Sequence, residues 1–120
     1  MNVRDQFSKY FTVAEAIQVL HGQYPLIREM VDISRILKEK KPAVSKLKII
    51  ENMERLTEII NLLGREGVLV KGVEEGLVDF PHFRPNGETV FLCYRLGEKS
   101  IEFWHPIEGG YRARQPLEAL

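Results

Sequence analysis

Residues 49–64 read IIENMERLTEIINLLG, and this stretch decides the first half of the fold. Apolar side chains recur in it at alternating steps of four and three residues: Ile49, Met53, Leu56, Ile60 and Leu63. This period puts them on one face of a helix, which we expect over residues 43–63 and which can stop at Gly64. Other apolar residues widen that face, namely Val44, Leu47, Ile50, Ile59 and Leu62. The predicted apolar band is broader than one neighbouring helix can cover.

A second long helix is expected earlier in the chain, over residues 13–40. Thr12 and Glu15 have the spacing of a capping box, in which each side chain accepts a hydrogen bond from the other residue's backbone N–H. The helical period of apolar residues continues across Pro25. A lysine-rich turn that ends at Pro42 separates the two helices, so they should form an antiparallel hairpin.

The length of this hairpin predicts self-association. Helices of about 21 and about 28 residues are about 30 to 40 Å long, which exceeds the width of a small sheet. Part of their apolar surface therefore needs another cover. The same hairpin from a second copy provides it in an antiparallel four-helix arrangement with two-fold symmetry. We predict a homodimer formed through the helices.

After Gly67 the apolar period changes to that of strands. Four strands are expected, over residues 68–71, 77–80, 89–96 and 100–105, with Gly97-Glu98-Lys99 as a short hairpin turn between the last two. Short connections imply antiparallel pairing. The fold class is therefore α+β in one domain, residues 1–120: a long antiparallel helical hairpin over about 12–64, then a small, about four-stranded antiparallel sheet and carboxy-terminal segment over about 67–120.

Composition excludes several classes of function. Seventeen basic and seventeen acidic residues give no overall field that would attract nucleic acid or an anionic membrane. No apolar run is long enough for a signal peptide or membrane span, so the cytoplasm is the expected compartment. Cys93 is the single cysteine, and neither it nor the histidines show the short spacings of zinc motifs. The sequence thus predicts no disulfide, no metal site and no cofactor.

Candidate binding residues gather in the predicted sheet and the segment after it. They are polar or aromatic residues in unusual places: Asp79, Arg95, Glu98, Trp104, His105, Arg112 and Arg114. Arginine and tryptophan dominate interface hot spots, which favours a binding or interaction module for a protein or a small anionic ligand. A second hypothesis is a hydrolase or transferase with His105 as acid or base and Asp79 orienting it, although no catalytic residue is assigned. A third is a purely structural salt-bridge network.

Several segments resemble one uncharacterised prokaryotic family, catalogued as domain of unknown function 2203. They occur in the family's order along nearly the whole chain: Tyr10 to Ala16, Gly76-Leu77-Val78-Asp79-Phe80-Pro81, Leu92-Cys93-Tyr94-Arg95-Leu96-Gly97-Glu98, Trp104-His105, Gly110-Tyr111 and Arg114-Gln115-Pro116. The chain differs from the family pattern at Tyr94, where tryptophan is expected, and at Pro106, where an acidic residue is more usual. The resemblance implies long helices plus a small sheet, and it supplies no functional residues.

Overall fold

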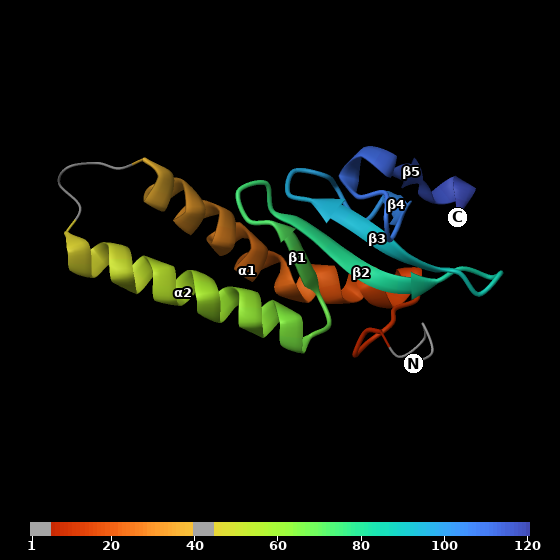
Figure 1. Ribbon diagram of the computed structural model, residues 1–120, viewed down its shortest axis with the longest axis horizontal. Coiled ribbons are helices and arrows are strands. Elements are labelled where there is room, and N and C mark those ends of the chain that lie inside the picture. The colour runs from red at the N-terminus through yellow and green to blue at the C-terminus, as the bar shows by residue number, and fades with distance from the viewer. Residues whose placement is uncertain (1–5, 40–44) are drawn as a thin grey trace.

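Two long helices lie side by side and are followed by an antiparallel sheet (Figure 1). The computed structural model describes residues 6–39 and 45–120. The helices are α1 (Val13–Lys38) and α2 (Lys46–Arg65). The strands follow as β1 (Leu69–Gly72), β2 (Leu77–Phe83), β3 (Thr89–Arg95), β4 (Phe103–Pro106) and β5 (Gln115–Pro116), with the short 3₁₀ helices η2 (Tyr111–Ala113) and η3 (Leu117–Ala119) around β5. The predicted α+β class, helical hairpin and antiparallel sheet are confirmed.

The helix starts are fixed by side-chain caps. At α1 the Thr12 N–H donates to Glu15 Oε1 at 2.9 Å and the Glu15 N–H donates to Thr12 Oγ1 at 3.1 Å, as the capping box predicts. The helix runs without interruption through Pro25. At α2 the cap is Ser45, whose hydroxyl accepts from the Lys48 N–H at 3.2 Å. The predicted start of this helix, residue 43, lies outside the described residues.

The end of α2 differs from the prediction. The helix continues through Gly64 to Arg65, and the chain turns at Gly67, which has a φ of +83°. The Gly67 N–H donates to the carbonyl of Gly64 at 3.0 Å. Glycine is favoured at position 67 because it has no Cβ and so adopts this left-handed conformation without a steric penalty.

The sheet has five strands in the order β1-β2-β3-β4-β5, so the prediction of four was one short. The fifth strand has two residues, too few for a readable alternation of apolar and polar side chains. The predicted tight hairpin at residues 97–99 was also wrong. Residues 96–102 form a longer connection between β3 and β4, held by hydrogen bonds between Arg95 and Glu98.

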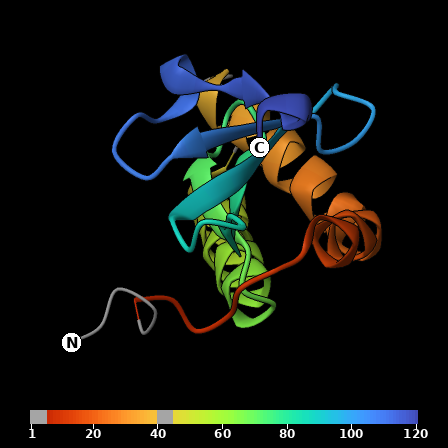
Figure 2. The same ribbon diagram turned by 90° about the vertical axis from the view of Figure 1, so that its right-hand side faces the viewer.

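Both helices lie against the same face of the sheet (Figures 1 and 2). The core between the helices and the sheet contains apolar residues from α1, α2 and alternate positions of the strands. It includes Leu20, Ile27, Met30, Ile59, Leu63, Val78, Phe80, Val90, Leu92, Tyr94 and Trp104. Alternation along β3 sends Phe91 and Cys93 to the opposite face, and both are buried there as well.

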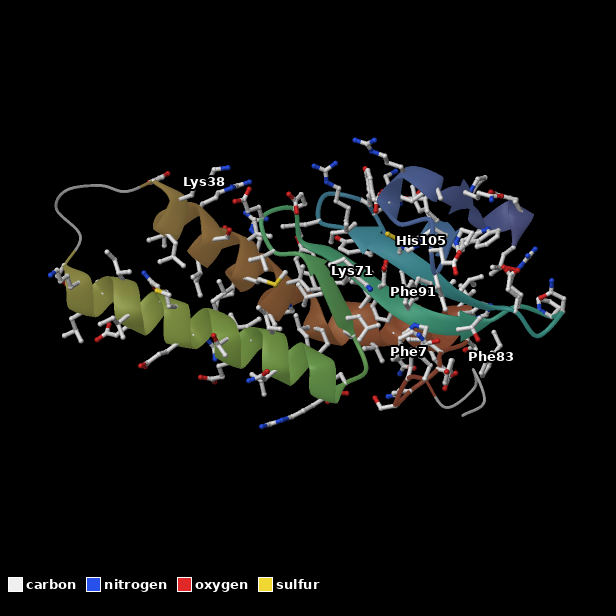
Figure 3. The ribbon with its side chains drawn as sticks, viewed as in Figure 1. Phe7, Lys38, Lys71, Phe83, Phe91 and His105 are labelled. Atoms are coloured by element: carbon white, nitrogen blue, oxygen red, sulfur yellow. The ribbon has the colours of Figure 1, made fainter. Side chains whose placement is uncertain are left out.

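Segments from the two ends of the chain cover that second face. The Phe7 ring meets the Phe91 ring edge-on, with their centroids 5.3 Å apart, and the ammonium of Lys71 lies over the Phe91 ring (Figure 3). From the carboxy-terminal segment the Arg114 guanidinium stacks over the Phe103 ring at 4.1 Å. Since the helices lie on the other face, these segments are what bury the polar residues of the second face.

The end of α1 and the start of α2 extend beyond the sheet (Figure 1). In α2 only Ile59 and Leu63 are fully buried, both in its last two turns. In the first two turns Leu47, Ile50 and Met53 are 65%, 51% and 55% exposed. The sequence prediction that the apolar band exceeds what this chain covers therefore agrees with the exposure of these side chains.

Gly76 lies where the turn between β1 and β2 approaches α1. Its φ is +63°, and a Cβ added there would lie 2.7 Å from Leu96 Cβ and 3.0 Å from Val31 Cγ2. Gly76→Ala should lower the free energy of unfolding by about 2–3 kcal/mol in urea denaturation, because backbone strain and steric overlap add.

Gly87 provides the matched control. It has a φ of +87°, and an added Cβ would meet no atom within 4 Å. Gly87→Ala should therefore lower the free energy of unfolding only by the cost of backbone strain, about 1 kcal/mol. Equal losses in the two variants would contradict the close packing at Gly76.

Candidate functional site

Three polar side chains meet on the second face of the sheet, one from each of three adjacent strands. Asp79 in β2 pairs directly with Cys93 in β3, and His105 in β4 pairs with Phe91, two residues along β3 from Cys93. Residues two apart in a strand share a face, so the register brings the three side chains together. One ligand atom from each lies within 4.8 Å of the other two.

His105 is held at both ring nitrogens. Nε2 lies 3.0 Å from Asp79 Oδ2, and Nδ1 lies 2.8 Å from the carbonyl oxygen of Pro106. A carbonyl oxygen only accepts, so Nδ1 must carry a proton. The side chains of His105 and Asp79 are 3% and 2% exposed, and Asp79 Oδ1 has no hydrogen-bond partner in the described part of the chain.

Burial and hydrogen bonding shift the pKa of His105 in opposite directions. Burial lowers the pKa of His105, but the hydrogen bonds to Asp79 and Pro106 outweigh it and the pKa is raised. Burial is the main cause that raises the pKa of the Cys93 thiol, and the charge of Asp79 raises it further. The Cys93 thiol therefore stays protonated at neutral pH, and a protonated thiol is a poor nucleophile.

A second polar group lies beside the first, and we call it the clasp: Arg95, Glu98, Tyr111 and Arg114. Both carboxylate oxygens of Glu98 accept from Arg114 Nη2 at 2.7 Å, and the side chains of these two residues are 19% and 10% exposed. Glu98 also accepts from the Arg95 N–H at 2.7 Å, and the Arg95 guanidinium donates to the Tyr111 hydroxyl at 3.2 Å. The clasp fastens the segment that contains η2 to the end of β3.

The remaining two candidate residues lie apart from these groups. Trp104 is on the helix-covered face within the core, where the Arg84 guanidinium lies 4.7 Å from its ring centroid. Arg112 is exposed in η2. The seven residues predicted from the sequence thus divide into the buried Asp79–His105 pair, the Arg95–Glu98–Arg114 part of the clasp, and two residues outside both.

Sequence reasoning missed two members of this region. Neither Cys93 nor Tyr111 was among the candidate residues. The signal that could have found Cys93 is the strand register, which places it opposite Asp79, and register depends on pairing that linear spacing does not show.

A surface cavity of about 430 Å³ between α1 and the β3–β4 connection was also not predicted from the sequence. Its lining residues are Leu20, His21, Tyr24, Tyr94, Gly97, Glu98 and Lys99.

The geometry limits what the cluster can do chemically. His105 offers no ring nitrogen to a substrate in this structure, since both nitrogens contact groups of the protein and the side chain is buried. General acid–base catalysis needs a proton within hydrogen-bond reach of the substrate. In contrast, a carboxylate, a thiol and an imidazole within 4.8 Å of one another are a donor set that could hold a metal ion.

Comparison with known proteins adds a family and no activity. Residues 9–117 match the model of a protein family described as Uncharacterized conserved protein (DUF2203). No curated protein and no solved structure matches the chain. Neither α1 nor α2 is long and apolar enough to cross a membrane.

Proposed function

The chain belongs to the family described as Uncharacterized conserved protein (DUF2203), and because that description names no activity we propose a function from the structure. We propose that the protein is a cytoplasmic, homodimeric interaction module that pairs with a second copy through the half of its helical hairpin that extends beyond the sheet. A reducing compartment suits Cys93, which is unpaired.

The exposed apolar surface of α2 carries this proposal. Ile50 and Met53 line an apolar groove of about 410 Å³ together with Glu54 and Thr57. The exposed side chain of Leu47 lies about one helical turn before Ile50. Large apolar side chains grouped on one exposed helix face are typical of an interaction site. Covering them with another apolar surface would stabilise the complex by about 25 cal/mol per Å² removed from water.

Charge placement along α2 favours a second copy as the occupant. Lys46 and Glu54 lie two turns apart on either side of Ile50, and neither forms an ion pair within the described part of the chain. A two-fold axis near Ile50 reverses the partner helix, so Lys46 of each copy would face Glu54 of the other. This self-complementarity is what an isologous antiparallel interface requires.

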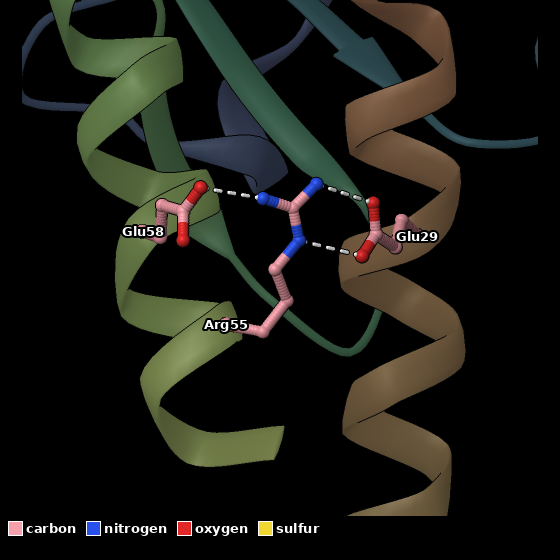
Figure 4. Close-up of polar contacts among 3 residues, drawn as sticks. All are labelled: Glu29, Arg55 and Glu58. Atoms are coloured by element: carbon pink, nitrogen blue, oxygen red, sulfur yellow. Dashed lines mark hydrogen bonds and ion pairs between the residues drawn. The ribbon is translucent and has the colours of Figure 1, made fainter. Parts of the chain in front are cut away.

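The two helices are also fixed to each other, which gives the partner a preformed surface. Arg55 of α2 donates to both carboxylate oxygens of Glu29 in α1, at 2.7 and 2.9 Å, and to Glu58 one turn along α2 at 2.7 Å (Figure 4). Bidentate pairing of this kind fixes geometry as well as charge.

Arg55→Met should lower the melting temperature slightly, since the bridge is partly exposed and such bridges contribute little. The effect should depend on pH. The hydrogen bonds from Arg55 hold the pKa of Glu29 below its ordinary value. Their contribution is therefore complete above the unfolded pKa of about 4.3 and is lost as the pH falls through the lower folded value. Melting curves at pH 7 and pH 3 should show a difference between wild type and variant that shrinks at pH 3, and a difference that grows would contradict the bridge.

For the sheet we propose a structural role of the clasp rather than an anion site. Arg114 is engaged by Glu98 and lies between the rings of Phe103 and Tyr111, at 4.1 and 4.7 Å. An anionic ligand would have to displace Glu98 from it. The clasp thus supports the third hypothesis drawn from the sequence better than a hydrolase, a transferase or a docking patch for small anions.

Light scattering after size-exclusion chromatography tests the proposed function. At micromolar concentration the mass should be twice the 13.9 kDa of one chain. A mass of one chain at every concentration up to about 100 μM would reject the homodimer, because a dimer weaker than that provides under about 6 kcal/mol.

A further inference from the structure

We propose that Asp79, Cys93 and His105 together bind one divalent transition-metal ion with the preferences of zinc. The three ligand atoms already lie within 4.8 Å of one another. Zinc binds nitrogen, oxygen and sulfur at about 2.0–2.3 Å in a tetrahedral arrangement, which places neighbouring ligand atoms about 3.3–3.8 Å apart. The cluster therefore has to close by about 1 Å, a distance that side-chain rotation can supply.

The orientation of His105 is that of a metal ligand. Nδ1 donates to the Pro106 carbonyl at 2.8 Å, and a backbone carbonyl on the far ring nitrogen is the usual outer partner of a metal-binding histidine. This hydrogen bond directs Nε2 toward Asp79 Oδ2 at 3.0 Å. Two atoms with lone pairs do not lie that close unless a cation lies between them. The cation is a proton in the metal-free protein and the metal ion in the bound one.

The second carboxylate oxygen of Asp79 favours a metal ion over a proton as the bound cation. Asp79 is 1% exposed, and its Oδ1 has no hydrogen-bond partner in the described part of the chain. A proton shared by Nε2 and Oδ2 leaves Oδ1 without a hydrogen bond other than the weak interaction of the Cys93 thiol with the Asp79 carboxylate, although buried polar atoms are almost always paired. A metal ion can take either carboxylate oxygen, or both, together with Nε2 and Sγ.

The exchange of protons for metal conserves charge in this buried place. In the metal-free cluster Nδ1 of His105 carries a proton, one further proton lies between Nε2 and Asp79 Oδ2, and the thiol is protonated, so the net charge of the cluster is zero. One divalent ion releases the proton between Nε2 and Oδ2 and the thiol proton to solvent and leaves a carboxylate, a neutral imidazole and a thiolate around it, again with a net charge of zero. Burial, which penalises an unbalanced charge, therefore does not oppose binding.

The donor set selects the class of ion. A thiolate and an imidazole favour zinc and other borderline transition metals over magnesium and calcium, which prefer an all-oxygen shell. The rings of Phe91 and Phe7 lie on the same side of the sheet as His105, with Phe91 5.5 Å from the imidazole (Figure 3). They limit access of water to the bound ion.

Metal titration of the full chain, purified without a histidine tag and stripped with a chelator, tests this site. Zinc measured in competition with a chromogenic chelator should bind as one ion per chain with a Kd below about 1 μM. Cobalt used as a probe should give the absorption of a thiolate-to-cobalt charge transfer. Cys93 is the single cysteine, so that absorption identifies the site without any variant.

Variants then separate this site from binding elsewhere. Cys93→Ala should abolish the charge-transfer absorption and weaken zinc binding by more than about 100-fold, since even an outer partner of a ligand contributes 10- to 100-fold. His21→Gln is the matched control, because His21 is exposed on α1, and it should bind zinc as wild type does. Failure of the wild-type chain to bind zinc stoichiometrically, or a cobalt complex without the thiolate absorption, overturns the proposal. So does zinc binding that Cys93→Ala leaves unchanged.

Discussion

Ile50→Glu should dissociate the proposed homodimer into monomers. Ile50 lines the apolar groove of α2, and two-fold symmetry would place the two introduced carboxylates close to each other near the axis. Loss of apolar burial and repulsion between like charges act together. We expect the dimer dissociation constant to rise by more than about 100-fold, a change of about 3 kcal/mol, in sedimentation equilibrium.

Two controls separate this result from unfolding or a general charge effect. Asn86→Asp adds the same charge in the turn between β2 and β3, where Asn86 Oδ1 accepts from the Glu88 N–H and an aspartate can do the same. It should leave the dimer intact. Circular dichroism of Ile50→Glu should keep the helix content of wild type, because Ile50 is exposed in one chain.

A charge exchange tests the antiparallel register of the same interface. Lys46→Glu should weaken the dimer, although a carboxylate in the first turn of a helix stabilises that helix. Lys46→Glu combined with Glu54→Lys should restore the affinity, because the two charges trade places across the axis. A double variant no better than the single one would contradict this register.

Asp79→Ala should be the most destabilising of the substitutions considered on the sheet. It leaves the buried imidazole of His105 without its carboxylate, and breaking a buried charge pair costs about 3–5 kcal/mol. Urea denaturation in the presence of a chelator measures this loss without any contribution from bound metal.

Two comparison variants show whether the stability loss of Asp79→Ala comes from a broken buried ion pair. Asp32→Ala removes an exposed aspartate whose nearest cation, Arg28, is 3.7 Å away, and it should change stability by less than about 0.5 kcal/mol. Replacing both members of the buried pair, Asp79→Val with His105→Leu, should cost less than Asp79→Ala alone, because no unpaired charge remains. A loss below about 1 kcal/mol for Asp79→Ala would show that the pair is not a buried ion pair.

The sequence by itself determined the two helices, the antiparallel sheet and the α+β class. The four-three period around Met53 and the capping box at Thr12 depend on neighbours within one or two turns, so they can be read directly from the chain. The same holds for the change to a strand-like period after Gly67. The excess of apolar surface on α2 was also visible, since counting apolar positions requires no partner.

Tertiary structure alone decided which polar residues meet. Asp79, Cys93 and His105 are separated by 14 and 12 positions (93 minus 79, 105 minus 93), and only the register of β2, β3 and β4 puts them side by side. A one-residue slip in that register would send each to the other face, and nothing in linear spacing reports it. The search for zinc motifs by short spacing therefore excluded a donor set that is assembled across strands. Trp104 and Arg112 lie one and seven positions from His105 in the sequence (105 minus 104, 112 minus 105), yet the pleat of β4 and the 3₁₀ turn η2 place them away from the donor set.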